Sequence, residues 1–326
     1  MTFPSSLRPL LLVGATLLVA ALALASLFVG VSRVSIPALL DGSDRALQVL
    51  AISRIPRTLA LVIAGAAMAV SGTIIQMLAR NRFVEPSTIG TVESASLGML
   101  LVMLLAPDMP VFGRMLVAAA FALAGTALFM RILRAVPLRS VLMVPLVGIM
   151  LGGVIGAVTT FLAYRFDLLQ SIGAWTTGDF SIVLRGRYEL LWISAGLTVI
   201  AYLAADRFTV AGLGETFTTN LGLNQRRVVG LGLTIVAVVT AAVVVTVGVI
   251  PFVGLVVPNV VSLWMGDNMR RSLPWIALLG AGFVLFCDLV GRLVIHPYEI
   301  PIGVVMGVIG SAFFLFLLLR RANHVA

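Results

Sequence analysis

The 326-residue sequence contains no lysine, only one cysteine and only two histidines. Without lysine, the chain cannot build the lysine-containing loop of P-loop ATPases or form a Schiff base. Cys287 has no disulfide partner within the chain, and its apolar neighbours are typical of a small core residue. Metalloprotease and serine-hydrolase motifs are missing, as is any cluster of metal-ligating side chains at suitable spacing. We therefore expect a chain that is not an enzyme and that binds no cofactor or metal itself.

Charge is equally scarce. Charged residues make up 11% of the sequence and hydrophobic residues 60%, whereas soluble domains are about a quarter charged. These charges are too few to cover a water-soluble surface, so we expect an integral membrane protein. The net charge of +9 comes from arginines that lie singly or in pairs between apolar runs. This pattern is typical of loops that orient a membrane protein and does not indicate a nucleic-acid partner.

Apolar runs recur along the whole chain. A bilayer is spanned by about 20 apolar residues, and runs near that length lie at 9–31, 57–79, 114–134, 140–162, 229–250, 273–295 and 303–320, with shorter ones at 90–106, 189–205 and 254–265. The first run is longer than a signal-peptide core of ~7–15 residues, so we expect it to be retained as a helix. The sequence thus predicts an all-α, polytopic membrane protein of about ten transmembrane helices, with residues 1–326 as one transmembrane domain.

The arginines also predict the orientation of the chain. With the N-terminus inside, the inner loops hold more arginines than the outer loops, as the positive-inside rule requires. Both termini are then expected to be cytoplasmic. The excess on the inner side is modest, so the outer arginines need a second explanation.

Residues 206–228 interrupt the apolar pattern with the sequence "GLGETFTTNLGLNQRR" at 212–227. This stretch predicts a short helix that is closed by Gly222, followed by a helix that is N-capped by Asn224. Two short helices at a glycine turn on the cytosolic face suit insertion into a groove on another protein. An ordinary inner loop is the alternative interpretation.

Four stretches carry a resemblance to a known family. They are "RIPRTLALVIAGAAMAVSGTIIQMLARNRFVEPSTIG" (54–90), "LGLNQRRV" (221–228), "GVIPFVGLVVPNVV" (248–261) and "DLVGRLVIHPYEIPIGVVMGVIGSAFF" (288–314). With them the chain resembles the FecCD-type permeases of binding-protein-dependent ABC importers for iron–siderophore complexes, haem and vitamin B12. The variants "TVESASLG", "WTTGDFSIVLRGRYE" and "HPYEIPIG" most resemble the branch that serves ferric siderophores, often of the catecholate type.

The resemblance implies the type II ABC importer permease fold and a complex in the cytoplasmic (inner) membrane. The expected partners are a second permease subunit, a cytosolic ABC ATPase dimer that binds ATP and Mg²⁺, and a periplasmic or extracellular siderophore-binding protein. The second permease is identical or, as is frequent in this branch, a related chain. A haem or cobalamin permease remains open. An ion-coupled secondary transporter is the alternative from another class, but its expected midplane carboxylate has only Asp288 as a candidate, next to Arg292.

The resemblance also assigns roles to residues. It implies that the 206–228 segment couples the chain to the ATPase through Gly212, Gly214, Glu215, Thr216, Phe217, Thr218, Asn220, Leu221 and Gly222. It further implies that Arg54, Arg57 and Arg292 face acidic residues on the two lobes of the binding protein. Such pairing mostly sets orientation and encounter rate. For Arg292, an i, i+4 ion pair with Asp288 is the alternative.

Four residues are candidates for the pathway or its gate. Glu93, near the start of a short apolar run, either lines the pathway or occupies the favourable field of a helix N-terminus. Asn81, and Arg139 with Ser140 in the "VPLRSV" turn (136–141), resemble the gate loops of the family at the inner mouth. Ordinary turn chemistry is the alternative for these three. The identity of the siderophore is not expected from this chain, because selectivity should lie mainly in the external binding protein.

Overall fold

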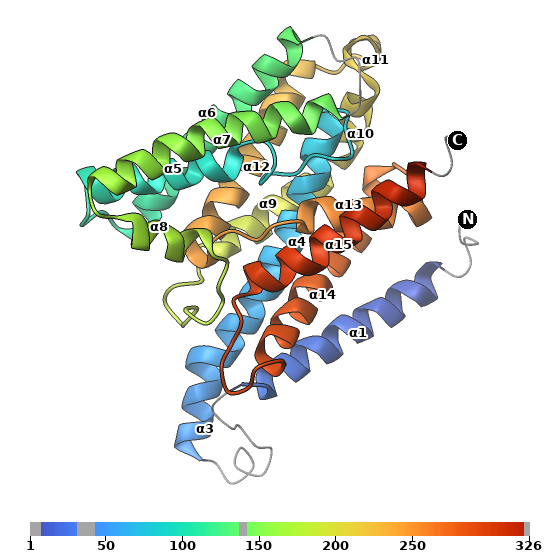
Figure 1. Cartoon of the computed structure of the whole chain (residues 1–326). Helices are drawn as coiled ribbons and strands as arrows, with labels where there is room; N and C mark the ends of the chain where they lie inside the picture. Colours follow the sequence, from blue (N-terminus) through green and yellow to red (C-terminus); the bar gives the residue numbers. More distant parts are fainter. Residues whose placement is uncertain (1–7, 31–42, 137–141, 323–326) are drawn as a thin grey trace.

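The structure is a computed structural model that describes residues 8–30, 43–136 and 142–322. The described residues form helices joined by turns, without a strand, in an elongated assembly (Figure 1). In chain order the elements are α1 (Arg8–Phe28), α3 (Asp44–Val49), the π-helical turn η1 (Leu50–Arg54), α4 (Ile55–Leu78), α5 (Thr91–Leu105), α6 (Val111–Ala135), α7 (Met143–Arg165), α8 (Leu169–Thr176), α9 (Leu191–Leu203), α10 (Ala205–Leu213), α11 (Glu215–Asn220), α12 (Gln225–Val247), α13 (Val253–Met265), α14 (Met269–Leu293) and α15 (Ile302–Ala322).

The predicted spans are present in the described part of the chain. Six helices are long and apolar enough to cross a bilayer, and α9 with α10 forms one further span that bends by 63°. The shorter apolar helices α5, α13 and Ile302–Phe316 of α15 complete the set. This agrees with the expected count of about ten. The α3–η1 stretch, the short α8 and the bent continuation of α9 as α10 were not expected from the sequence.

Helix α4 forms the centre of the assembly, because it packs against α14, α13, α12 and α9 (Figure 1). Two glycine pairs allow backbones to approach closely here. A Cβ on Gly72 would lie 2.0 Å from the carbonyl oxygen of Gly254, and one on Gly65 would lie 2.5 Å from that of Gly280. Within a membrane, small residues at such crossings replace hydrophobic burial as the source of helix association.

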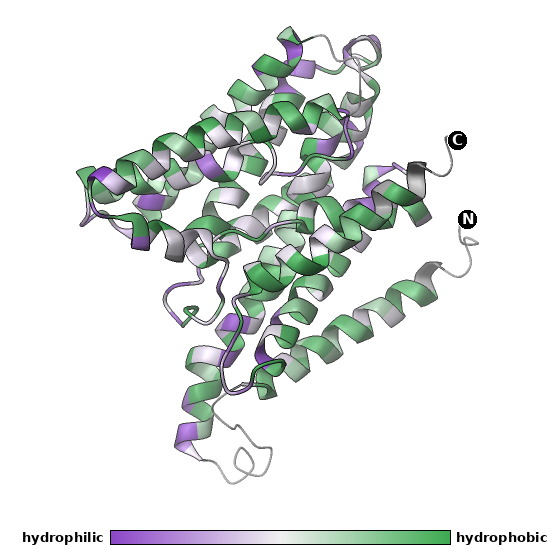
Figure 2. Ribbon diagram, viewed as in Figure 1, coloured by the Kyte–Doolittle hydropathy of each residue, from purple (hydrophilic) through white to green (hydrophobic). Residues whose placement is uncertain are grey.

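The remaining helices lie around this centre. Helices α5, α6 and α12 pack closely together, α7 covers α5, and α1 lies along α14 (Figure 1). Apolar residues cover most helix surfaces, and hydrophilic residues gather near the helix ends and in the connections (Figure 2). Side chains such as Ile149, Val154 and Phe161 of α7 are exposed to the surroundings of the isolated chain. An apolar surface of this extent suits lipid or another membrane subunit.

Candidate coupling segment and arginine cluster

The 206–228 segment forms a compact turn of short helices at one end of the assembly (Figure 1). Gly214, with φ of +122°, separates α10 from α11, and Gly222, with φ of +76°, follows α11. The side chain of Asn224 accepts a hydrogen bond from the backbone N–H of Arg227 at 3.1 Å and so caps α12. The structure therefore confirms the predicted short helix, its closure by Gly222 and the cap on the next helix.

The interior of this turn is held by Thr218, which is buried. Its hydroxyl donates to the carbonyl oxygen of Gly214 at 2.7 Å, and its own carbonyl accepts from Leu223 N–H at 3.0 Å. The outer surface instead presents two apolar side chains, because Phe217 is 62% and Leu221 63% exposed. Adjacent exposed apolar residues on a rigid turn are suitable anchors for a partner protein. Of the other residues predicted here, Glu215, Thr216 and Asn220 are exposed on α11. Gly212, near the end of α10, faces Met77 of α4.

Side chains outside the segment fix α10 to the assembly. Arg270, in the first turn of α14, forms an ion pair with Asp206 at 2.8 Å. The backbone N–H of Met269 donates to the hydroxyl of Thr209 at 3.2 Å. A Cβ on Gly212 would lie 3.1 Å from the sulfur of Met77 in α4. These contacts connect α10 to the ends of α4 and α14, a connection that sequence reasoning missed because its partners are distant in the chain.

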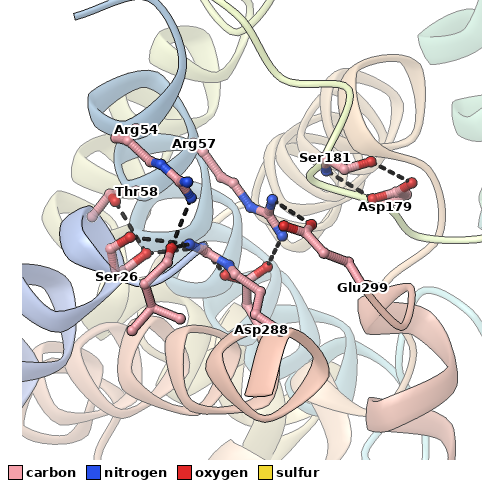
Figure 3. A network of polar contacts seen from close by, with 10 residues as sticks. Ser26, Arg54, Arg57, Thr58, Asp179, Ser181, Asp288 and Glu299 are labelled. Atoms are coloured by element: carbon pink, nitrogen blue, oxygen red, sulfur yellow. Dashed lines mark hydrogen bonds and ion pairs between the residues drawn. The ribbon is translucent and has the colours of Figure 1, made fainter. Parts of the chain in front are cut away.

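A cluster of arginines lies at the opposite end of α4 and α14 (Figure 3). Arg57 donates to Asp288 and to Glu299, each at 2.7 Å. Arg292 pairs with Asp288 as well, and also donates to the hydroxyl of Ser26 in α1 at 2.9 Å. Asp288 is therefore shared between two guanidinium groups. This ion pair between Asp288 and Arg292 is the one that the i, i+4 alternative predicted.

The cluster is buried in the isolated chain. Arg292 is only 2% exposed, and Arg54 and Arg57 are buried too. Arg54 donates to the carbonyl oxygen of Val29, which follows α1, at 2.7 Å. Arg57 and Arg292 are thus paired with two carboxylates, those of Asp288 and Glu299. The sequence did not predict this internal network, and the docking role of the three arginines stays a prediction.

The connection between α4 and α5 is hydrogen-bonded to the start of α13. Glu85, which is buried, accepts hydrogen bonds from the backbone N–H of Phe252 at 2.8 Å and from the hydroxyl of Ser87 at 2.5 Å. Asn259 of α13 donates to the carbonyl oxygen of Arg82 at 2.8 Å. Sequence analysis missed Glu85. The signal that could have identified Glu85 is an acidic residue directly before a proline, in a chain with few acidic residues.

Two of the predicted pathway residues lie near this connection. Asn81 is buried and accepts a hydrogen bond from the backbone N–H of Phe83 at 2.8 Å, which is turn chemistry. Glu93 lies in the first turn of α5, after Gly90, and its carboxyl group is close to Gly152 of α7. One of its oxygens is buried without a hydrogen-bond partner among the described residues. Arg139 and Ser140 lie outside the described residues.

No group of three or more histidine, cysteine or acidic side chains that could hold a metal ion occurs in residues 8–30, 43–136 and 142–322. The arrangement instead combines a multi-pass helical body with an exposed turn suited to a protein partner. These features define a multi-pass helical membrane protein. Comparison with known proteins identifies the family of the chain.

The model of the FecCD transport family matches residues 17–320. The petrobactin import system permease YclN of Bacillus subtilis (strain 168) is 50% identical over 93% of this chain and 96% of its own length. The ferric-anguibactin transport system permease FatD of Vibrio anguillarum is 39% identical over 91% and 95%. A solved inward-facing structure, assigned to a metal-chelate type ABC transporter, superposes with a TM-score of 0.80 at 28% identity and covers 96% of this chain and 99% of its own.

The chain belongs to the FecCD transport family. It is a multi-pass membrane protein with the fold of a type II ABC importer permease, and permeases of this kind are the non-catalytic membrane subunits of their transporters. More distant relatives include the vitamin B12 import permease BtuC of Vibrio cholerae, which is 34% identical over 83% of this chain and 82% of its own length.

Proposed function

We propose that this chain is the permease through which an ABC importer moves a ferric siderophore across the cytoplasmic membrane. The observation that carries the proposal is the compact 206–228 turn with its exposed Phe217 and Leu221, on a fold shared with ABC transporters. The petrobactin and anguibactin permeases support a siderophore as the substrate, because they are more similar to this chain than the vitamin B12 permease.

The partners follow from the two ends of the assembly. The 206–228 segment docks on a cytosolic ABC ATPase dimer, which binds ATP and Mg²⁺ and moves α10 and α11 during its cycle. The opposite end, with the arginine cluster, faces the siderophore-binding protein outside. This orientation places both termini in the cytoplasm. A second permease subunit, identical or related, covers part of the exposed apolar surface and completes the pathway.

The concentration of three guanidinium groups at this end of the assembly supports docking of an acidic partner there (Figure 3). Arg57 is the best placed of the three arginines, because Glu299, its second partner, keeps a side chain that is 20% exposed. Arg292 is enclosed by α1 and α14 and acts by holding Asp288 in position.

Glu93 is proposed to line the pathway next to α7. Its partly unsatisfied carboxylate is expensive within a membrane unless water reaches it, and a water-filled passage between two permease subunits supplies that water. Asn81 belongs to the inner connection that shapes the cytosolic mouth. The gate role of Arg139 and Ser140 is kept as a proposal from the resemblance alone.

The test is purification of the tagged chain from its native membranes in several mild detergents, with identification of the proteins that accompany it. A P-loop ATPase in stoichiometric amount is expected, and a second permease would show a heterodimer. Uptake by the intact cells is then measured with iron-loaded catecholate siderophore, haem and cobalamin. Transport that continues without ATP, by a chain that purifies alone, would overturn the importer and favour an ion-coupled transporter.

A further inference from the structure

A cavity of about 260 Å³ opens at the ends of α4, α10, α13 and α14, beside the 206–228 segment. Its lining includes polar side chains from each of these regions, among them Gln76, Arg80, Arg82, Thr209, Ser262 and Asp267. Thr73 and Ile276, which lie inside the α4 and α14 spans, form part of the wall. The cavity thus extends from the helix ends along the last turns of α4 and the first turns of α14.

Arg80 enters this cavity from an unusual backbone conformation. It follows the last turn of α4 with φ of +48°, and the backbone N–H of Asn81 donates to the carbonyl oxygen of Gln76 at 2.9 Å. This is the position after a helix C-terminus that glycine usually occupies. Residues other than glycine adopt this conformation uncommonly, so Arg80 is a position at which a functional role is worth testing. The guanidinium lies against Gly214, because a Cβ on that glycine would be 3.4 Å from its Cζ.

The charges around the cavity favour an anion. Arg82 is already engaged by Asp267 and Ser262. Arg80 has no carboxylate within ion-pair distance in the part of the chain that the structure describes. Asp267 is the only acidic residue in the described lining, so the cavity carries a net positive charge. A guanidinium binds a phosphate group through two parallel hydrogen bonds, and hydroxyl groups such as that of Ser262 add further donors.

We propose that this cavity binds the phosphate group of an anionic phospholipid, held by Arg80 at the end of α4. The proposal rests on the proposed orientation, which places this end of the assembly at the inner leaflet. Basic pockets between helices at this level are suited to lipid headgroups. Met77 and Ile276 supply apolar wall for the glycerol and the first acyl carbons. The bound lipid contacts the turn between α10 and α11 and braces it against α4.

The test uses the purified full-length chain in neutral detergent and measures its thermal unfolding midpoint. Phosphatidylglycerol, phosphatidylcholine and inorganic phosphate are titrated separately. The test variant is Arg80→Asn, because asparagine accepts a positive φ more readily than arginine and the fold is kept. The matched control is Arg226→Gln, which removes an exposed arginine from the first turn of α12, outside the cavity lining.

Phosphatidylglycerol is expected to raise the midpoint of the wild type and of Arg226→Gln. In Arg80→Asn the lipid concentration needed for half the effect should rise about tenfold, the usual loss for one charge-assisted contact. Before lipid is added, Arg80→Asn should unfold at the wild-type midpoint or above. Phosphatidylcholine, whose choline cancels the phosphate charge, should have a much smaller effect.

Three outcomes would overturn the proposal. Equal losses in Arg80→Asn and Arg226→Gln would show that the lipid responds only to surface charge. An equal effect of phosphatidylcholine would show that the positive cavity does not select its ligand. An Arg80-dependent shift with inorganic phosphate that also removes the response to phosphatidylglycerol would make free phosphate the ligand in place of lipid. None of these measurements needs the ATPase or a siderophore, so a negative result leaves the proposed import function untouched.

Discussion

Arg57 of α4 and Glu299 of the connection between α14 and α15 form an ion pair at 2.7 Å across 242 positions of the chain. Asp288, the other partner of Arg57, is buried, whereas Glu299 remains partly exposed. Glu299 therefore occupies the side of Arg57 that an external carboxylate would approach. The pair holds the guanidinium in place and also competes with any acidic residue of a docking partner.

This competition gives a prediction for docking. In Glu299→Gln the charge of Arg57 is less compensated, so the affinity for the siderophore-binding protein should rise severalfold, a gain of about 1 kcal/mol in binding free energy. The affinity is measured by surface-immobilised binding at low and moderate salt. Glu189→Gln serves as the control, because the side chain of Glu189 is exposed and accepts a hydrogen bond from the backbone N–H of the nearby Gly186. A lower or unchanged affinity in Glu299→Gln would argue against Arg57 as a docking residue.

Asp288 should contribute far more to stability than to binding. Its replacement by asparagine leaves Arg57 and Arg292 buried with one carboxylate, that of Glu299. Breaking a buried pair in this way costs about 3–5 kcal/mol. We expect Asp288→Asn to lower the unfolding midpoint strongly in detergent. Asp179→Asn should have little effect, because Asp179 is only partly buried and bonds locally to Ser181 (Figure 3).

In contrast to Asp288, Phe217 should contribute to the binding of the ATPase and not to the stability of the fold. Its ring is exposed in the isolated chain, so Phe217→Ser should change the free energy of unfolding by less than about 0.5 kcal/mol. Loss of a central anchor typically costs about 2 kcal/mol of binding, and the amount of ATPase that copurifies should fall accordingly. Thr219→Ala, an exposed change on the same short helix, is the control. Full retention of the ATPase by Phe217→Ser would exclude this residue as an anchor.

The helices were largely predictable because the bilayer sets the length of an apolar span. The run at 114–134 became α6 (Val111–Ala135), and even the short run at 254–265 became α13 with Pro258 inside. Local signals also sufficed for the turn at Gly222 and the cap at Asn224. The bend between α9 and α10 was missed because Ala204 and its neighbours include no glycine or proline to mark it.

The candidate sites were less predictable because their contacts join distant parts of the chain. The pair of Asp288 and Arg292 was foreseeable from i, i+4 spacing, but Glu299 reaches Arg57 only through the packing of α4 against α14. Glu85 likewise meets Phe252 across 167 positions. The sequence places such residues in loops or at helix ends and leaves open whether they face water, a partner or each other.

The glycines at the crossing of α4 and α13 give a final prediction about packing. A methyl group on Gly72 would lie 2.0 Å from a backbone oxygen of Gly254, and backbone cannot move aside as a side chain can. Gly72→Ala should therefore cost about 1–3 kcal/mol or more in the free energy of unfolding. Gly230, in α12, has no atom within 4 Å of its would-be Cβ, so Gly230→Ala should stabilise the helix by roughly 0.5–1 kcal/mol. Thermal unfolding of the two variants in one detergent compares them directly. Similar unfolding midpoints for Gly72→Ala and Gly230→Ala would contradict the close packing of α4 against α13.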